Sequence, residues 1–328
     1  MTTQQHKTIN WGIIGLGKIA HKFAQDLLHI EDAKLYAVAS RHQDKANAFA
    51  QTYSAKIAFG DYESLVKDPN IDAIYIATPH VFHHEHTILC LTHKKAVLCE
   101  KPFAMNLSEV DDMIATAKAN HTLVMEAMWT YFLPHYQFVL QHIKDETFGK
   151  IRTIEADFGF KPEIDMTSRV FNKSLGGGSL LDIGIYPIFA ALSTLGAPIH
   201  IESKATFFDN DVDSSCLMLF SYDNGVEARL KSTLLQNTPT EAIFYCEYGT
   251  IKINSRFQEP SNVTLISEGK ESTTTFDYST NGYYYETVHF NQLLRDHKTE
   301  SDIMTFNFSR TLLGLLDTVR LQIGLNYK

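Results

Sequence analysis

The chain has 328 residues, more than one hydrophobic core usually serves, so two domains are expected. Hydrophobic residues make up 44% and charged residues 20%, which is an ordinary globular composition. The net charge of -9 comes without a clustered basic face, so composition and charge exclude a nucleic-acid partner.

Cysteine usage and hydropathy indicate the cellular location of the protein. The four cysteines, Cys90, Cys99, Cys216 and Cys246, form no CxxC pair and fit no zinc spacing, so we interpret them as reduced thiols. Residues 1–10 are polar and lack an apolar stretch of signal-peptide length. No segment approaches the ~18 unbroken apolar residues of a membrane span. The sequence therefore predicts a cytoplasmic protein with no membrane partner.

The first part of the chain, from Lys7 to about Asn120, alternates short apolar runs with amphipathic stretches. The expected strands are Ile9–Ile14, Lys34–Ala39, Ala73–Ala77, Ala96–Leu98 and one near Thr122–Met125. The expected helices are Ile19–Leu28, Gln43–Tyr53, Tyr62–Val66, His84–Thr92 and Ser108–Ala119. This alternation predicts a doubly wound parallel sheet covered on both faces. Ser108 followed by Asp111 predicts a capping box at the start of the last helix.

After about Lys150 the apolar pattern changes to period two. The expected strands are Arg152–Phe158, Ile201–Phe207, Cys216–Tyr222, Val226–Leu234, Ala242–Tyr248 and Val263–Ser267. Asp223-Asn224-Gly225 between two of these runs predicts a hairpin. The chain then returns to helix over Tyr284–Arg295 and Phe306–Leu325.

These patterns predict an α/β fold with a Rossmann domain and a C-terminal α+β domain. Residues 1–122 would bind the dinucleotide, and residues 123–328 would bind substrate and dimerise through a large, mostly antiparallel open sheet, with the final helices packing back on the first domain. One face of that sheet would cover the domain's own helices. The other would expose a large apolar patch unless a partner covered it, so a homodimer is expected.

A glycine-rich turn follows the first expected strand. Gly15-Leu16-Gly17-Lys18-Ile19-Ala20 opens an amphipathic helix, as the dinucleotide-binding motif requires. Gly15 permits the tight turn, and Gly17 lets the backbone approach a pyrophosphate at the helix N-terminus. A glycine-rich turn without a ligand is the weaker alternative.

The end of the second strand bears on the choice of cofactor. An NAD-binding fold normally places Asp or Glu there to hold the ribose 2′-hydroxyl, and this chain has Ser40-Arg41. Arg41 can pair with a 2′-phosphate and Ser40 can donate to it, which favours NADP(H), with NAD(H) as the alternative. A solvated surface arginine is the competing interpretation of Arg41.

Thr78-Pro79-His80 ends another strand at the edge where ligands collect in open α/β sheets. His80, His83, His84 and His86 cluster in the sequence, so a zinc site is an alternative. The only nearby carboxylate, Glu85, would point off their shared helical face. We therefore favour a role for His80 and His83 in lining the cofactor crevice, and we predict no metal.

Glu100-Lys101-Pro102 follows a buried strand and leads into a proline turn. At the carboxyl edge of the sheet, Lys101 would lie near a bound nicotinamide, and partial burial and the positive charge of the cofactor would lower its pKa. A lysine tuned toward neutrality can pass a proton to or from a substrate oxygen.

Asp182 and Tyr186 lie four residues apart after Gly176-Gly177-Gly178. On a helix both would face one side. Tyr186 could then hydrogen-bond the substrate oxygen, and Asp182 could orient the substrate or hold Lys101. A capping role for Asp182 and a core role for Tyr186 are the alternatives. The predicted catalytic set is Lys101, Tyr186 and Asp182.

The motifs GLGKIA, ATPHVFHHEH, AVLCEKP, EAMWTYFLP and GGGSLLDIGIYP occur in this order. Together they resemble the glucose–fructose oxidoreductase/inositol dehydrogenase (Gfo/Idh/MocA) family over most of the chain. The resemblance is greatest to the branch of dimeric dihydrodiol dehydrogenases and NADP-dependent D-xylose dehydrogenases.

The resemblance implies roles for individual residues. Lys101 would be catalytic with Tyr186 as its proton-handling partner, and Asp182 would contact substrate. Trp129 would wall the nicotinamide pocket, and Arg169 would approach cofactor or substrate. The full predicted cofactor-binding set is Gly15, Leu16, Gly17, Lys18, Ile19, Ser40, Arg41, Thr78, Pro79, His80, His83, Glu100, Lys101, Trp129 and Arg169. Relatives in this branch often carry arginine where this chain has Tyr131, a departure that bears on substrate identity.

The expected function is an NADP(H)-dependent oxidoreductase acting on a C–OH or C=O carbon of a sugar, polyol or cyclic diol. One alternative is a non-catalytic dinucleotide-binding regulator, although such a sensor would not need Lys101, Asp182 and Tyr186. Another is a lyase or glycosidase that recycles a permanently bound NAD, which net cofactor turnover would distinguish. Fold alone does not name the substrate.

Overall fold

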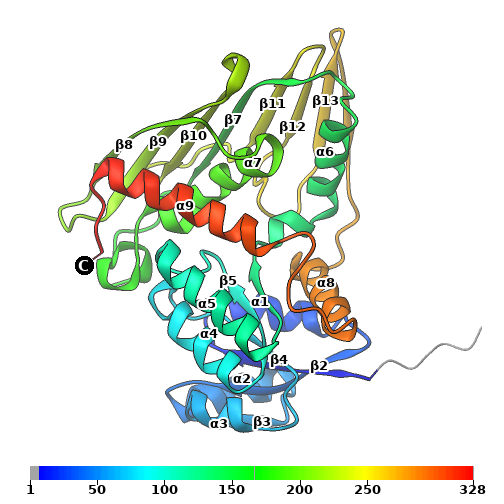
Figure 1. Cartoon of the computed structure of the whole chain (residues 1–328), viewed down its shortest axis with the longest axis vertical. Helices are drawn as coiled ribbons and strands as arrows, with labels where there is room; N and C mark the ends of the chain where they lie inside the picture. The colour runs from blue at the N-terminus through cyan, green and yellow to red at the C-terminus, as the bar shows by residue number, and fades with distance from the viewer. Residues whose placement is uncertain (1–6, 166, 328) are drawn as a thin grey trace, which may run out of the picture. The chain divides into compact units, whose positions relative to one another are not determined.

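The computed structural model describes residues 7–165 and 167–327 (Figure 1). Proximity of Cα atoms divides the chain into two compact units. Unit 1 comprises residues 1–129 and 278–309, and unit 2 comprises residues 130–277 and 310–328. These units differ from the predicted division at 122/123, because residues 123–129 and 278–309 group with the first part of the chain.

Unit 1 contains a six-stranded parallel sheet in the order β3-β2-β1-β4-β5-β6, which is the doubly wound Rossmann order. The strands are β1 (Ile9–Ile14), β2 (Ala33–Ala39), β3 (Ile57–Phe59), β4 (Ala73–Ile76), β5 (Ala96–Glu100) and β6 (Val124–Ala127). The predicted parallel sheet is therefore confirmed. β3 was not predicted, since three half-buried residues carry too little pattern to mark a strand.

Helices join these strands. They are α1 (Lys18–Leu27), α2 (Gln43–Tyr53), α3 (Tyr62–Lys67), α4 (His83–Thr92) and α5 (Leu107–Asn120). The capping box of α5 lies two residues before the predicted pair of Ser108 and Asp111. Asn106 is the N-cap, and its side chain accepts from Glu109 N at 3.0 Å and donates to the Glu109 carboxylate at 2.8 Å. Asn106 caps as well as serine does, so the two registers were equivalent by residue type.

A late segment completes unit 1. Helix α8 (Tyr283–Arg295) is held at its start by the buried Asp26 of α1, whose carboxylate accepts from Asn281 N at 2.9 Å and from Tyr284 N at 3.1 Å. Farther along, the Trp11 indole donates to Asn291 at 3.1 Å. Helix α9 (Phe306–Ile323) begins in unit 1 and ends in unit 2.

Unit 2 is built on an eight-stranded sheet in the order β14-β13-β12-β11-β7-β10-β9-β8. The strands are β7 (Ile151–Gly159), β8 (His200–Phe207), β9 (Asp213–Ser221), β10 (Glu227–Thr233), β11 (Ala242–Cys246), β12 (Thr250–Ile253), β13 (Val263–Ser267) and β14 (Lys270–Thr274). All neighbours are antiparallel except β7 and β10. The predicted hairpin at Asp223-Asn224-Gly225 joins β9 to β10, with Asn224 and Gly225 at positive φ.

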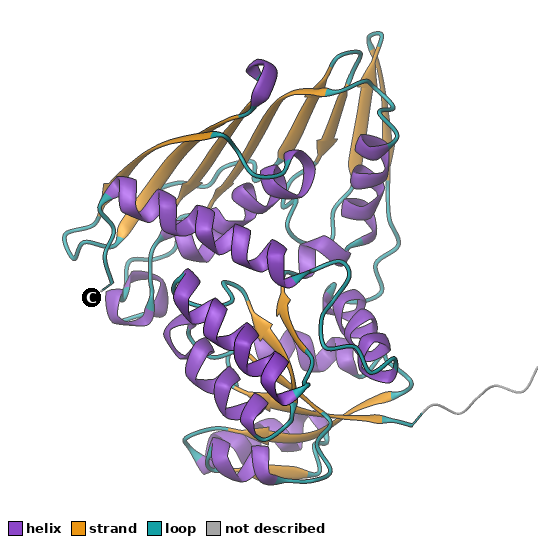
Figure 2. Ribbon diagram, viewed as in Figure 1, coloured by secondary structure: helices purple, strands orange, loops and turns teal. Residues whose placement is uncertain are grey.

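The helices of unit 2 pack on one side of this sheet (Figure 2). They are α6 (Pro134–Lys144), a π-helical turn over Leu180–Gly184 and α7 (Ile185–Leu195). Alternation places Ile154, Ala156 and Phe158 of β7 in the core under these helices, while Glu155 and Asp157 point to the other side. The large, mostly antiparallel sheet with one covered face is therefore confirmed.

The open face of the sheet carries charged side chains as well as the apolar ones that were predicted. Period two directs the apolar set to the covered side, so the open face mixes apolar and charged side chains. A hollow of about 860 Å³ lies along it. Its lining includes Leu217, Leu219, Ile243, Glu155, Asp157, Glu202, Lys204, Arg229 and Lys231.

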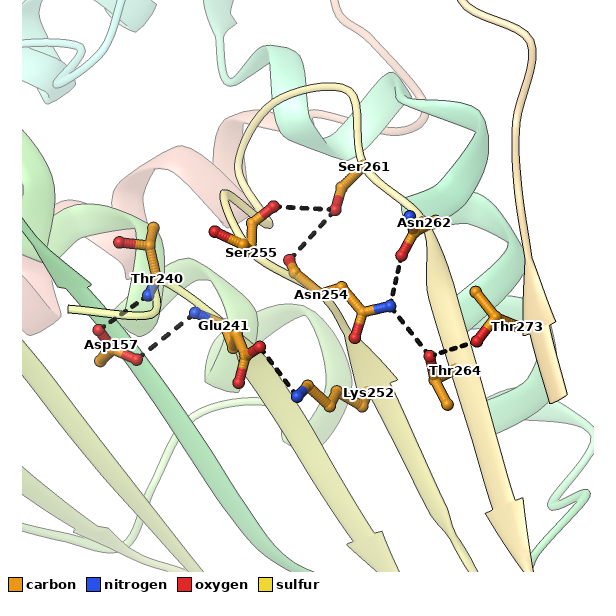
Figure 3. A network of polar contacts seen from close by, with 10 residues as sticks. All are labelled: Asp157, Thr240, Glu241, Lys252, Asn254, Ser255, Ser261, Asn262, Thr264 and Thr273. Carbon is orange, nitrogen blue, oxygen red and sulfur yellow. Dashed lines mark hydrogen bonds and ion pairs between the residues drawn. The ribbon is translucent and has the colours of Figure 1, made fainter. Parts of the chain in front are cut away.

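Toward β14 the same face is polar (Figure 3). Lys252 pairs with Glu241 at 2.8 Å, and Asp157 accepts from Thr240 N at 3.1 Å. Beyond them Thr264 bonds the Thr273 hydroxyl at 2.8 Å. The apolar part of the open face is thus confined to the strands around β9 and β11.

Among the described residues one helical stretch, Lys173–Leu195, is long and apolar enough to cross a membrane by length and composition. Of its apolar window, 94% is buried inside the protein, as is usual for a core helix. It includes the π-helical turn and α7, which pack on the sheet.

Asp213, at the start of β9, fixes the beginning of that stretch. It is fully buried, and its Oδ2 accepts from Ser179 Oγ and from Leu180 N, both at 2.7 Å. Gly178 lies so close that a Cβ there would be 2.0 Å from Asp213 Oδ1. Burial raises the pKa of Asp213 to about 7, against the lowering effect of the Ser179 and Leu180 hydrogen bonds.

The Asp213→Asn variant should show a flatter dependence of stability on pH than the native protein. An acid whose pKa is raised by folding loses stabilising free energy as pH rises from its ordinary pKa toward the folded value of about 7. Between pH 4 and 7 the native protein should therefore lose on the order of 3 kcal/mol relative to the variant. Thermal unfolding across this range measures it, with the exposed Asp211→Asn as control. Parallel pH profiles for the native protein and Asp213→Asn would contradict the assignment.

Candidate active site

The turn between β1 and α1 lies against the end of β4. Gly15 has φ +89°, and a Cβ there would lie 2.6 Å from both Ala77 C and Thr78 N, so only glycine fits. At Gly17, by contrast, a Cβ would meet nothing within 4 Å. Gly17 is the N-cap of α1, which begins at Lys18 without a side-chain cap. Open space beside uncapped N–H groups fits a dinucleotide phosphate.

The other predicted residues of this turn differ in exposure. Leu16 is buried in the core, whereas Lys18 and Ile19 are exposed, with Ile19 at 38% of its surface. The backbone of the turn, rather than these side chains, makes the phosphate cradle.

Arg41 follows β2 and is exposed, while Ser40 is buried and accepts from His42 N at 3.2 Å. The Arg41 guanidinium lies 5.9 Å from the centre of the Phe82 ring. Burial, and secondarily Arg41, lowers the pKa of His86 to about 4, so this imidazole is neutral at pH 7. A cation beside neutral rings fits a ribose phosphate with its adenine base.

The histidines that follow β4 have separate partners. His83 lies between two carbonyl oxygens, 2.8 Å from Thr78 O and 2.8 Å from Pro102 O. His84 pairs with Asp112 at 2.7 Å, and His86 lies 3.0 Å from the Thr78 hydroxyl. His83 thus ties the end of β4 to the turn after Lys101. Within residues 7–165 and 167–327 no group of three or more His, Cys, Asp or Glu side chains could hold a metal ion.

Two hydrogen bonds to the Glu100 carboxylate anchor the Glu100-Lys101-Pro102 turn. The Glu100 carboxylate accepts a short hydrogen bond from the Tyr75 hydroxyl of β4, and Lys101 N donates to its other oxygen at 3.2 Å. Burial raises the pKa of Tyr75 well above its ordinary value, and the Glu100 carboxylate raises it further. The phenol therefore keeps its proton and stays a donor to Glu100.

Helix α8 adds a second acid to this cluster. Both carboxyl oxygens of Glu286 are fully buried and lack a hydrogen-bond partner among the described residues. Burial raises the pKa of Glu286 well above its ordinary value, with Glu100 and Asp26 adding to the effect. Nearby, the Trp129 ring stacks on Tyr283 with centroids 4.5 Å apart, so Trp129 has one face covered within unit 1.

Three predicted site residues lie in unit 2. Asp182 is in the π-helical turn and Tyr186 is in the first turn of α7, so both lie in helical structure, as was expected. Asp182 Oδ1 pairs with Arg169 Nη2 at 2.9 Å. The Tyr186 ring is 5% exposed and lies 5.7 Å from the Phe158 ring. Asp182 is therefore oriented by Arg169.

The structure thus gathers the predicted residues into two groups. The strand ends of unit 1 carry Gly15 to Ile19, Ser40, Arg41, Thr78 to His83, Glu100, Lys101 and Trp129. Unit 2 carries Arg169, Asp182 and Tyr186. Sequence reasoning missed Tyr75, Phe82 and Glu286 as neighbours of the first group, because nothing local to them signals a contact with a distant turn.

Two family models match the chain. The oxidoreductase family with an NAD-binding Rossmann fold matches residues 9–128, and the GFO/IDH/MocA C-terminal domain matches residues 136–252. A trans-1,2-dihydrobenzene-1,2-diol dehydrogenase of Xenopus tropicalis is 34% identical over 97% of this chain and 98% of that protein. The NADP(+)-dependent scyllo-inositol 2-dehydrogenase of Bacillus subtilis is 33% identical over the same shares.

Solved structures agree with this match. A 3-ketoreductase from Actinomadura kijaniata, crystallised with NADP and TDP-benzene, superposes with a TM-score of 0.88 at 25% identity, covering 97% of this chain and 98% of that one. The aldose-aldose oxidoreductase of Caulobacter crescentus shares the fold, with a TM-score of 0.88 at 21% identity over 96% and 97% of the two chains. The protein described here therefore belongs to the Gfo/Idh/MocA family and is an NAD(P)-dependent oxidoreductase.

Proposed function

We propose that this enzyme uses NADP(H) and acts on a C–OH or C=O carbon of a sugar, polyol or cyclic diol. The observation that carries the cofactor choice is Arg41, beside neutral rings where an acidic residue would hold the NAD ribose. Relatives that act on a dihydrodiol, an inositol and a ketone support the substrate class. A screen of aldoses, polyols and diols with NADP+ and NAD+, followed by the absorbance of reduced nicotinamide, tests both.

The cofactor would be held in unit 1. The uncapped start of α1 would bind the pyrophosphate, Ser40 and Arg41 the 2′-phosphate, and Trp129 would lie beside the nicotinamide. When bound, the cofactor would supply hydride-transfer chemistry at the carbon of the C–OH or C=O group. Lys101 and Tyr186 would handle the proton of the substrate oxygen, while Asp182, oriented by Arg169, would accept a substrate hydroxyl.

We propose that residues 1–122 provide most of the dinucleotide site, to which Trp129 adds, and that residues 123–328 otherwise bind substrate and form the dimer. The four cysteines are free thiols, which supports a reducing, cytoplasmic location. Cell fractionation would check the location.

We also propose a homodimer through the open face of the sheet in unit 2. That face carries cations and anions in similar number, so a two-fold axis can bring opposite charges together. Leu217 of β9 lines the hollow and is 54% exposed, and the hollow of about 860 Å³ can receive side chains from a second copy.

Replacing Arg41 by alanine should raise the KM for NADP+ by about tenfold or more, the worth of one charge-assisted phosphate contact of roughly 1.5–3 kcal/mol. The KM for NAD+ should barely change, because NAD+ has no 2′-phosphate. Initial rates with both cofactors measure the effect, and Lys45→Ala removes an exposed cation of α2 as the matched control. Equal losses with both cofactors would show that Arg41 does not contact the phosphate.

Replacing Lys101 by alanine should lower kcat by ~10²–10⁴, the usual worth of a positioned general base. Cofactor affinity should stay near normal, because the phosphates are held elsewhere. Tyr186→Phe removes only the hydroxyl, and a loss of similar size would place the phenol in the same proton transfer. The double variant should lose little more than either single one. Lys22→Ala serves as control, since Lys22 is exposed on α1. Near-normal kcat in Lys101→Ala would refute the role.

Light scattering at micromolar concentration should give the mass of a dimer. Leu217→Asp replaces an apolar side chain of the proposed interface by a carboxylate and should shift the equilibrium toward monomers, because that carboxylate would have to be desolvated on association. Leu321→Asp is the control, as Leu321 is 84% exposed on α9. A monomeric mass for the native protein would exclude the dimer.

A further inference from the structure

Glu126 is a buried carboxylate of unit 1 to which the proposed reaction gives no role. It lies on β6, within the EAMW stretch, and is 2% exposed. Register pairs Cys99 with Glu126 and Glu100 with Ala127, so Glu126 sits beside the end of β5, just before Lys101. A buried carboxylate needs hydrogen bonds or an opposite charge.

The contacts of Glu126 lead to the turn that follows Lys101. Oε1 accepts from Phe103 N at 3.1 Å, two residues after Lys101. The Ser309 hydroxyl of α9 gives a second hydrogen bond. Oε2 is buried and has no hydrogen-bond partner among the described residues. The Glu126 carboxylate thus clamps the turn through Oε1, while Oε2 has no hydrogen-bond partner among the described residues.

Two charged side chains, Glu100 and Lys101, affect the pKa of Glu126. Burial raises its pKa to about 7, the Ser309 and Phe103 hydrogen bonds oppose this, Glu100 raises it and Lys101 lowers it. Cys99 also faces Glu126, but burial raises the pKa of this thiol well above its ordinary value, so it carries no charge. Because charge coupling is mutual, an ionised Glu126 must favour the ammonium form of Lys101.

We propose that Glu126 is a positioning residue that clamps the Lys101 turn through Phe103 N and sets the charge state of Lys101 through its own carboxylate. This role rests on the proposed function, in which Lys101 must be neutral to accept a proton. An ionised Glu126 then holds Lys101 in its charged form to higher pH, and removal of the Glu126 charge lets Lys101 lose its proton at lower pH.

Two substitutions separate charge from clamping. Glu126→Gln keeps an acceptor oxygen for Phe103 N and removes the charge. Glu126→Asp keeps the charge and withdraws the oxygen by one methylene. Competitive labelling of the whole protein with trace acetic anhydride, read on the peptide that holds Lys101, gives the pH of half-labelling without any turnover.

Glu126→Gln should move the half-labelling pH of Lys101 downward by about 0.5 unit or more, since a neighbouring anion is lost. Glu126→Asp should leave it within about 0.2 unit of the native value, while thermal stability falls. Other lysines give the internal reference. An unchanged midpoint in Glu126→Gln, or equal shifts in both variants, would overturn the proposal.

If Glu126→Gln does not fold, Ser309→Ala serves instead. It removes a hydrogen bond that favours the ionised Glu126, so it should shift the midpoint in the same direction by a smaller amount, and no shift would count against the coupling. In the active enzyme, the acidic limb of kcat/KM should move with the labelling midpoint while the KM for NADP+ stays constant. Because labelling needs no substrate, it tests the charge coupling even if the proposed reaction is wrong. Loss of activity without a shift in the labelling midpoint would mean that Glu126 acts only by clamping the turn, which would contradict the proposed effect on the charge of Lys101.

Discussion

The close approach of Gly15 to the end of β4 is the contact on which unit 1 depends. A side chain at this position would meet the backbone of Ala77 and Thr78 at 2.6–2.7 Å. The same strand end is then tied onward, since Thr78 O lies 2.8 Å from His83, and His83 lies 2.8 Å from Pro102 O. The phosphate cradle and the lysine turn are therefore parts of one packed assembly rather than two independent loops.

Parallel pairing explains why these parts meet. All six strands of the sheet run the same way, so the turns after β1, β2, β4 and β5 emerge at one edge. Backbone groups at this edge have left the sheet and need other partners. His83 and the carboxylates of Glu100 and Glu126 supply them.

Buried acids recur as anchors of the segments that carry candidate site residues. Glu126 holds Phe103 N after Lys101, and Asp213 holds Leu180 N before Asp182. Each carboxylate is buried, and burial raises each pKa to about 7. The desolvation cost of such a group is offset only where its hydrogen bonds are kept. We therefore expect both segments to respond to pH in the neutral range, each through its own acid.

Local pattern was sufficient for the regular part of the fold. Residues Ile9–Ile14 and Gln43–Tyr53 form the strand and helix that were expected, since their apolar period and flanking turns agree. The strands β3, β12 and β14 and the helix α6 were missed, because short or mixed-polarity segments are fixed by pairing with distant neighbours rather than by their own period. The start of α5 was misplaced by two residues because several capping residues compete there.

The residues of the candidate site also divide into those that local sequence predicts and those that it does not. Glycines of the cradle, Arg41 and Lys101 could be named from sequence because each follows an apolar strand at a fixed position. Glu126 and Asp213 could not be named, because their roles depend on Phe103 and Leu180, which lie 23 and 33 residues away in the chain. Both side chains are also buried, and the charge pattern of the sequence does not reveal that burial.

Two polar side chains of unit 2, Tyr131 and Arg169, bear on the substrate class that we propose. Tyr131 stands where relatives often carry arginine, and its ring packs edge-on against Phe189 with centroids 5.2 Å apart. Burial raises the pKa of Tyr131, so its hydroxyl stays neutral and cannot compensate an anion. The guanidinium of Arg169 is already paired with Asp182. If Asp182 contacts substrate as we propose, an anionic substrate would have to compete with that carboxylate for Arg169, whereas a polyol or diol would donate its hydroxyls to Asp182 and leave the ion pair intact.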